Sequence, residues 1–250
     1  MRPPQPASKT LPWATNIRLL LVAVAGVALS VSSQAVWIGK IHCLGDSLTV
    51  GAGPGTRGGG YRWYLKQMLA AKGVEFDFVG MSVEWPGGLT DPNHDGHSGW
   101  TSFELGNGRP DGVGNSGTWL LSTRPDVVIV MVGRNDLYPW ADTLQNYRKI
   151  ADQIAAANPN ARTLWANVAL PREKNAFEIL HCEIQDQALI SLVSERKAFG
   201  QIIDRVDAYR SLSARDDIYS DAIHLNDKGY VALARLFATR LTNLSHLGRP

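Results

Sequence analysis

Cysteine is scarce in this chain, with two among 250 residues. Cys43 falls in a predicted strand and Cys182 in a predicted helix, so their spacing leaves open whether they meet. A disulfide would suit an exported protein, but two buried thiols are favoured over a bridge.

An excess of charge of one sign is missing as well. The formal net charge is +2, from 25 basic and 23 acidic residues. Three of the basic residues and none of the acidic ones lie in residues 1–35, so residues 36–250 hold 22 basic and 23 acidic residues. Without a basic surface, nucleic acid is excluded as an expected partner.

Long hydrophobic runs are limited to one, Leu19–Val31. It has 13 residues, whereas a membrane-spanning helix needs about 20. Basic residues precede the run and small residues follow it, which predicts a secretory signal peptide cleaved between Ala35 and Val36. An uncleaved anchor is the alternative. We therefore expect a secreted protein, free of the membrane after cleavage, with one domain over residues 36–250.

Beyond this segment, predicted strands and helices alternate. Asp126–Val132 is an apolar run rich in β-branched residues, which is typical of a parallel strand buried on both faces. Residues 81–117, rich in Gly, Pro, Asp and Asn, predict a long loop, and Asn175 with Glu178 forms a predicted capping box. The pattern predicts a single-domain three-layer α/β/α sandwich around a parallel five-stranded sheet. The predicted strands are residues 36–44, 74–79, 126–132, 161–169 and 200–206, and the predicted helices are 61–72, 141–157, 177–196 and one from about 226.

Residues suited to nucleophilic catalysis follow these strands. Ser47 lies in the sequence Gly-Asp-Ser-Leu-Thr directly after the first strand, and Asp221 and His224 lie three residues apart near the C-terminus. A serine hydroxyl needs a base such as His224, and Asp221 can orient that base. The oxyanion that develops needs donors, which the backbone of Gly99 and the side chain of Asn135 can supply.

Four blocks in order resemble the GDSL, or SGNH, hydrolases. They are Gly-Asp-Ser-Leu at 45–48, Gly99 within His-Ser-Gly-Trp-Thr, Gly-Arg-Asn-Asp at 133–136 and Asp-Ala-Ile-His at 221–224. The resemblance implies a flavodoxin-like SGNH hydrolase fold with Ser47, Asp221 and His224 as the catalytic triad. It also implies an oxyanion hole of the Ser47 and Gly99 N–H groups and the Asn135 side chain, and no cofactor or metal.

Within that superfamily, the chain looks most like carbohydrate esterase family three, whose members are secreted acetylxylan esterases. The resemblance rests on Asp-Gly-His-Ser-Gly-Trp at 95–100, a Pro-Asp-Val-Val strand at 125–128 and His-Leu-Asn-Asp-Lys-Gly-Tyr at 224–230. It implies an esterase for short acyl esters whose partner is an acetylated polysaccharide such as xylan. Three alternatives stay open: a lysophospholipase or thioesterase for longer acyl chains, an acyltransferase, and a non-catalytic carbohydrate-binding protein.

The remaining polar and aromatic residues have both functional and structural interpretations. Arg134, between Gly133 and Asn135, departs from the usual small or polar residue and could either reach substrate or point into solvent. Trp85, Trp100 and Trp140 could stack on a sugar or anchor their loops. A structural role is favoured for Asp46 and Asp136, and a non-metal role for His94, Asp95 and His97. The oligomeric state is open, with a monomer favoured.

Overall fold

The computed structural model of the protein describes residue 1, residues 35–136 and residues 142–243. Residues Gln34–Pro250 form one compact unit. The predicted signal peptide falls almost entirely outside the described residues, so its cleavage stays a prediction. Among the residues described, no helix is long and apolar enough to cross a membrane.

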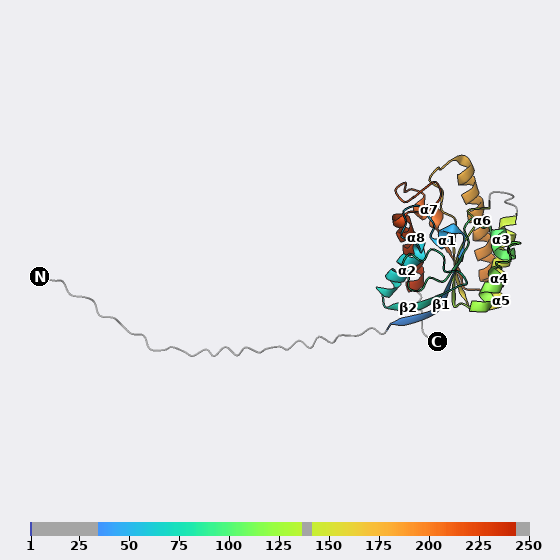
Figure 1. Ribbon diagram of the computed structural model, residues 1–250, viewed down its shortest axis with the longest axis horizontal. Coiled ribbons are helices and arrows are strands. Elements are labelled where there is room, and N and C mark those ends of the chain that lie inside the picture. Colours follow the sequence, from blue (N-terminus) through green and yellow to red (C-terminus); the bar gives the residue numbers. More distant parts are fainter. Residues whose placement is uncertain (2–34, 137–141, 244–250) are drawn as a thin grey trace. The chain divides into compact units, whose positions relative to one another are not determined.

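A parallel sheet forms the centre of this unit (Figure 1). Its order is β2-β1-β4-β5-β6, so the chain starts near the middle and winds outward in both directions. The predicted five parallel strands are therefore confirmed, and a two-residue strand, β3, adds to them by pairing with the end of β1. The strands are β1 (Val36–Gly45), β2 (Val74–Val79), β3 (Asp95–Gly96), β4 (Val127–Met131), β5 (Arg162–Ala166) and β6 (Ile203–Val206).

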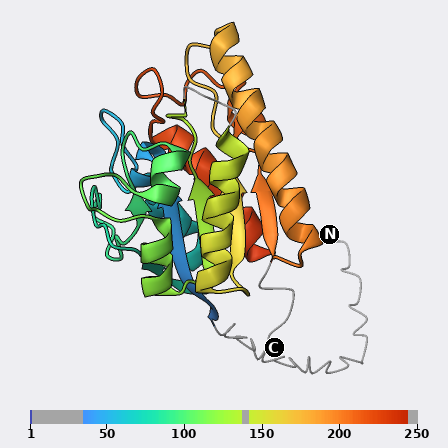
Figure 2. The same cartoon turned by 90° about the vertical axis from the view of Figure 1, so that its right-hand side faces the viewer.

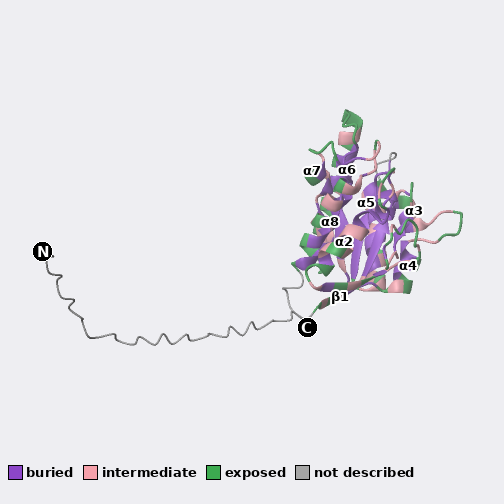
Figure 3. Ribbon diagram, turned by 60° about the vertical axis from the view of Figure 1, so that its left-hand side comes forward, coloured by how far each residue is buried: buried purple, intermediate pink, exposed green. Residues whose placement is uncertain are grey.

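Helices cover both faces of the sheet, as Figure 2 shows for the face that carries α5. Alternate residues of β4 serve two separate cores: Val127, Ile129 and Met131 face one, and Val128 and Val130 face the other. β4 in the middle of the sheet is buried along its whole length (Figure 3), which explains its uninterrupted apolar sequence. The first core is closed by α2 (Gly60–Ala70), α7 (Ala208–Leu212) and α8 (Asp227–Thr242), and the second by α3 (Ser102–Asn107), α4 (Ser116–Thr123), α5 (Thr143–Ala157) and α6 (Ala176–Ala198).

The predicted long loop over residues 81–117 is wrong in part, because β3, α3 and the start of α4 lie within it. Both helices begin with reciprocal capping boxes, at Thr101 with Glu104 and at Asn115 with Thr118. Such caps satisfy backbone N–H groups that a short helix would otherwise leave without partners. The abundant Gly and Pro of this segment predicted a loop, so the two helices that these caps stabilise were missed.

The predicted capping box at the start of α6 is only half present. The Asn175 side chain accepts a hydrogen bond from the Glu178 N–H at 3.0 Å, but the Glu178 carboxylate pairs with Arg134. The two cysteines are free and buried, as favoured from the sequence. Burial raises the pKa of both the Cys43 and the Cys182 thiols to about 12, so both stay protonated.

Candidate active site

Ser47 lies at the point where β1 turns into α1 (Ser47–Val50). The turn needs glycine at position 45, because a Cβ there would lie 2.0 Å from the Met131 carbonyl oxygen. Asp46 caps the short helix, since its Oδ1 accepts from the Leu48 N–H at 3.0 Å. Burial raises the Asp46 pKa to about 7, and the structural role expected for this residue agrees with its place in the turn.

A hydrogen-bonded chain joins Ser47, His224 and Asp221. His224 Nε2 lies 3.1 Å from Ser47 Oγ, and His224 Nδ1 lies 2.8 Å from Asp221 Oδ2. A carboxylate only accepts hydrogen bonds, so we assign the imidazole proton to Nδ1. Nε2 is then unprotonated and faces the serine hydroxyl as a base must.

The loop of Asp221 and His224 is held by its own backbone. Asp221 Oδ1 accepts the N–H groups of Ile223 at 2.9 Å and of His224 at 2.7 Å. Burial opposes ionisation of Asp221, but these two hydrogen bonds and the imidazole outweigh it and lower the carboxyl pKa. The group is therefore an anion beside His224 at neutral pH.

The two further candidate donors lie beside Ser47 because their segments pair with β1. β3 pairs with Leu44 and Gly45, and the His97 N–H donates to the Gly45 carbonyl at 2.9 Å. Gly99 follows at the surface with φ of +77°, a conformation that glycine adopts without strain. Asn135 follows β4, which also pairs with β1. It donates one amide hydrogen to the Trp100 carbonyl at 2.9 Å. Its second amide hydrogen stays available for a substrate oxygen.

The His97 and Trp100 rings are structural parts of the turn that presents Gly99. The His97 ring stacks on the rings of both Trp100 and Trp119, with centroids 4.4 and 4.5 Å away, and those two rings lie 5.8 Å from each other. Trp100 is only 4% exposed, so it is placed as a loop anchor with little surface for a sugar. Trp85 is exposed, and Trp140 lies outside the described residues.

Arg134 takes neither of the two positions considered from the sequence. Its guanidinium is 5% exposed and forms an ion pair with Glu178 in the first turn of α6. The pair ties the segment that carries Asn135 to α6. Asp136 is likewise structural, because its carboxylate accepts both the N–H and the hydroxyl of Ser102 at the start of α3.

The polar residues near position 95 are engaged with one another rather than arranged around an ion. His42 Nε2 lies 2.7 Å from Asp95 Oδ2, and the His94 ring interacts with the Gly96 N–H and the Glu84 carbonyl. Throughout the described ranges, no group of three His, Cys, Asp or Glu side chains is arranged to hold a metal.

Arg109 is a residue of the site that the sequence did not point out. Its Nη2 donates to the Gly99 carbonyl at 3.1 Å, while its Nε pairs with Glu104 at 2.8 Å. The guanidinium also lies 5.1 Å from the centre of the Trp100 ring. Thr101 and Glu104 had a readable capping-box spacing, but nothing in the sequence connected Arg109 to Gly99.

Known proteins share this arrangement of elements. The solved structure of the Clostridium thermocellum family 3 carbohydrate esterase is 27% identical, with a TM-score of 0.70, over 84% of this chain and 98% of that one. A carbohydrate esterase family 3 structure from Talaromyces cellulolyticus is 23% identical with a TM-score of 0.69, over 84% and 99% of the two chains. An acetyl esterase mutant solved with acetate is 23% identical with a TM-score of 0.66, over 82% and 97%. The last two are similar in fold alone. No curated protein sequence matches the chain.

The sequence profile of the GDSL-like lipase/acylhydrolase family matches residues 43–232, which contain all four blocks and every residue placed around Ser47 above. With the esterase structures that share its fold, this match makes the protein a carboxylic ester hydrolase. The chain belongs to the GDSL-like lipase/acylhydrolase family.

Proposed function

We propose that the protein is a secreted serine esterase that removes acetyl groups from a polysaccharide such as xylan. The observation that carries the proposal is the Ser47–His224–Asp221 chain, with contacts of 3.1 and 2.8 Å. Both contacts are of hydrogen-bond length, so the nucleophile is aligned with its base.

The reaction has two stages in this proposal. His224 Nε2 takes the Ser47 proton as Oγ attacks the acyl carbonyl, and Asp221 stabilises the imidazolium that forms. The Ser47 and Gly99 N–H groups and the Asn135 amide hold the oxyanion. His224 then gives the proton to the ester oxygen of the sugar as the bond from that oxygen to the acyl carbon breaks. The sugar departs as an alcohol, and an acyl-serine remains. A water molecule, deprotonated by the same imidazole, hydrolyses that ester and restores the serine.

The preference for acetyl groups on polysaccharide rests on similarity. The 27% identical structure is a family 3 carbohydrate esterase, and the sequence around Gly99 and His224 resembles the same family. An extracellular polysaccharide substrate would also fit the signal peptide predicted for residues 1–35.

The test compares p-nitrophenyl esters from acetyl to palmitoyl with acetate release from acetylated xylan. We expect strong preference for the acetyl ester, together with acetate release that Ser47→Ala lowers at least about a thousandfold. Labelling with a fluorophosphonate should modify the wild-type protein and spare Ser47→Ala. Activity that rises with acyl length and is absent on xylan would instead indicate a lipase-like or thioesterase enzyme.

Export has its own test. Expression of the full chain in a secreting host should yield a mature protein whose N-terminus is Val36. Recovery of the uncut chain in the membrane fraction would indicate an anchor and would contradict secretion.

A further inference from the structure

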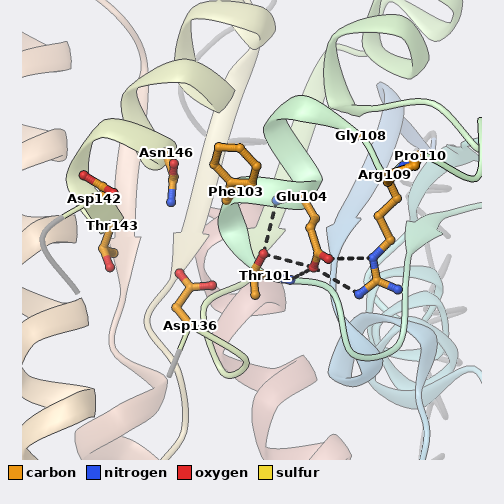
Figure 4. A pocket seen from close by; sticks show the side chains of 10 residues that line it. All are labelled: Thr101, Phe103, Glu104, Gly108, Arg109, Pro110, Asp136, Asp142, Thr143 and Asn146. Carbon is orange, nitrogen blue, oxygen red and sulfur yellow. Dashed lines mark hydrogen bonds and ion pairs between the residues drawn. The ribbon is translucent and has the colours of Figure 1, made fainter. Parts of the chain in front are cut away.

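A groove of about 430 Å³ lies beside the site, and none of the roles assigned so far uses it. Its volume falls within the range of small-molecule sites in proteins. As Figure 4 shows, its side chains come from α3 and the turns on either side of it, from the segment after β4 and from the start of α5. They include Thr101, Phe103, Arg109, Asp136, Asp142 and Asn146.

The groove is lined by close sequence neighbours of two residues that carry proposed oxyanion donors. Asp136 directly follows Asn135, and Thr101 comes two residues after Gly99. Arg109, in the wall of the groove, donates to the Gly99 carbonyl at 3.1 Å. A long ester substrate bound at Ser47 would therefore have this groove next to its reacting group.

An exposed aromatic ring lies within the groove. The Phe103 side chain is 57% exposed, whereas Leu105 of the same helix is buried. In Figure 4 the ring lies between two polar groups, with Asn146, Asp142 and Asp136 on one side and Glu104 with Arg109 on the other. A sugar ring, with apolar C–H faces and a rim of hydroxyls, matches a phenyl surface flanked by hydrogen-bonding groups.

The charges of the groove favour a neutral ligand. Arg109 and Glu104 form an ion pair, and the Asp136 carboxylate is engaged by Ser102. Asn146 donates to the Ser102 hydroxyl at 3.0 Å, which leaves its amide oxygen as an acceptor. With the exposed Asp142 carboxylate, the groove offers acceptors for hydroxyl groups. Its described lining residues include no unpaired cation for an anionic sugar or a phosphate.

We propose that this groove binds the backbone sugars of a neutral polysaccharide next to the acetylated residue, with the Phe103 ring as the stacking surface. The proposal deepens the proposed function and rests on it. It separates recognition of the polysaccharide from the chemistry at Ser47, because Phe103 contacts sugars that do not react.

The test replaces the ring. Phe103→Ala should raise the KM for acetylated xylo-oligosaccharides relative to the KM for p-nitrophenyl acetate by about three- to tenfold, the range expected for loss of one stacking contact. Phe103→Trp, which keeps an aromatic surface, should restore the ratio. Phe199→Ala is the matched control, because Phe199 is 78% exposed but lies at the end of α6, near the start of β6 and on the edge opposite Ser47.

A second measurement separates the groove from the reaction. Titration calorimetry of unacetylated xylo-oligosaccharides against Ser47→Ala should show binding that the added Phe103→Ala weakens by a similar factor. If wild-type protein releases acetate from xylan but the KM ratio of Phe103→Ala equals that of Phe199→Ala, the groove proposal is wrong and the proposed function stands. If wild-type protein hydrolyses p-nitrophenyl acetate but not xylan, the polysaccharide function fails. In that case calorimetry tests the groove proposal by itself. Binding of xylo-oligosaccharides that depends on Phe103 supports the groove proposal, and absence of binding overturns it.

Discussion

Replacement of Asp221 by asparagine should disable His224 through a change of tautomer. Asp221 Oδ1 accepts the backbone N–H groups of Ile223 and His224, at 2.9 and 2.7 Å. An amide at this position must keep its oxygen on that side, because an NH₂ group would face two donors. The NH₂ group of the variant then faces His224 Nδ1, which must accept. The imidazole proton moves to Nε2, where it points at Ser47 Oγ and prevents the ring from acting as a base.

The magnitude follows from the roles lost. The corresponding change in a serine protease lowers kcat about 10⁴-fold with its geometry intact, because the imidazole is in the wrong tautomer. Here the expected loss is of the same order, about 5.4 kcal/mol of transition-state stabilisation. The free energy of unfolding should stay within about 0.5 kcal/mol of the wild type, because both backbone hydrogen bonds are kept.

The assay is kcat on p-nitrophenyl acetate, with urea unfolding of each variant measured in parallel. Asp217→Asn is the matched control, since Asp217 lies in the same loop and is exposed, and its carboxylate forms surface ion pairs with Lys228 and Arg215. The control should keep its activity within about twofold, as surface pairs contribute little. If Asp221→Asn keeps more than a tenth of the wild-type kcat while folded, the assigned tautomer and the role of Asp221 are both refuted.

Three further predictions concern Asn135, His94 and the thiols. Asn135→Ala should lower kcat by about 10²–10³, or 2.7–4 kcal/mol, and a near-wild-type rate would remove Asn135 from the oxyanion hole. Burial, followed by the charge of Arg62, lowers the His94 pKa from 6.5 to about 3, so the unfolded chain binds the extra proton as pH falls below 6.5. The stability advantage of wild type over His94→Gln, measured by urea unfolding, should therefore shrink by about 1.6 kcal/mol between pH 6.5 and pH 5, whereas a constant difference would contradict a buried neutral imidazole. Cys43 and Cys182 should resist a thiol reagent in the folded protein and both react in denaturant, and rapid labelling of either would contradict their burial.

The sheet and the four blocks could be predicted from the sequence because both depend on local patterns of residues. A parallel strand buried on both faces has an apolar sequence, as in β4, and the first three blocks follow β1, β3 and β4. Since the carboxyl ends of parallel strands share one edge, the residues after them had to lie near each other. His224 follows α7 rather than a strand, so its 3.1 Å contact with Ser47, 177 residues away, does not follow from that rule.

The features of the site that could not be predicted from the sequence depend on contacts between residues far apart in the chain or in an irregular segment. The ion pair of Arg134 with Glu178 joins residues 44 positions apart, and each residue alone had a plausible local role. The contact of Arg109 with Gly99 lies in a segment whose Gly and Pro content predicted a loop, and no periodicity marks it. From the sequence, Trp100 was a candidate to stack on a sugar from an exposed loop. Its ring is instead buried, because the His97 and Trp119 rings pack against it.

The two halves of the site are held rigid in different ways. Ser47, Gly99 and Asn135 follow three strands that pair side by side, so the backbone ladder of β3, β1 and β4 fixes the nucleophile and the oxyanion donors together. His224 has no such ladder. Its loop is closed by the pairing of Tyr219 with Leu225 and is fastened by burial of Leu225.

Both devices set positions before substrate arrives, which lowers the cost of reorganisation during the reaction. They differ in what disturbs them. A change that loosens the pairing of β1 with β4 should lower stability and activity together. A change at Leu225 should first displace the base, so activity should fall while the sheet stays folded.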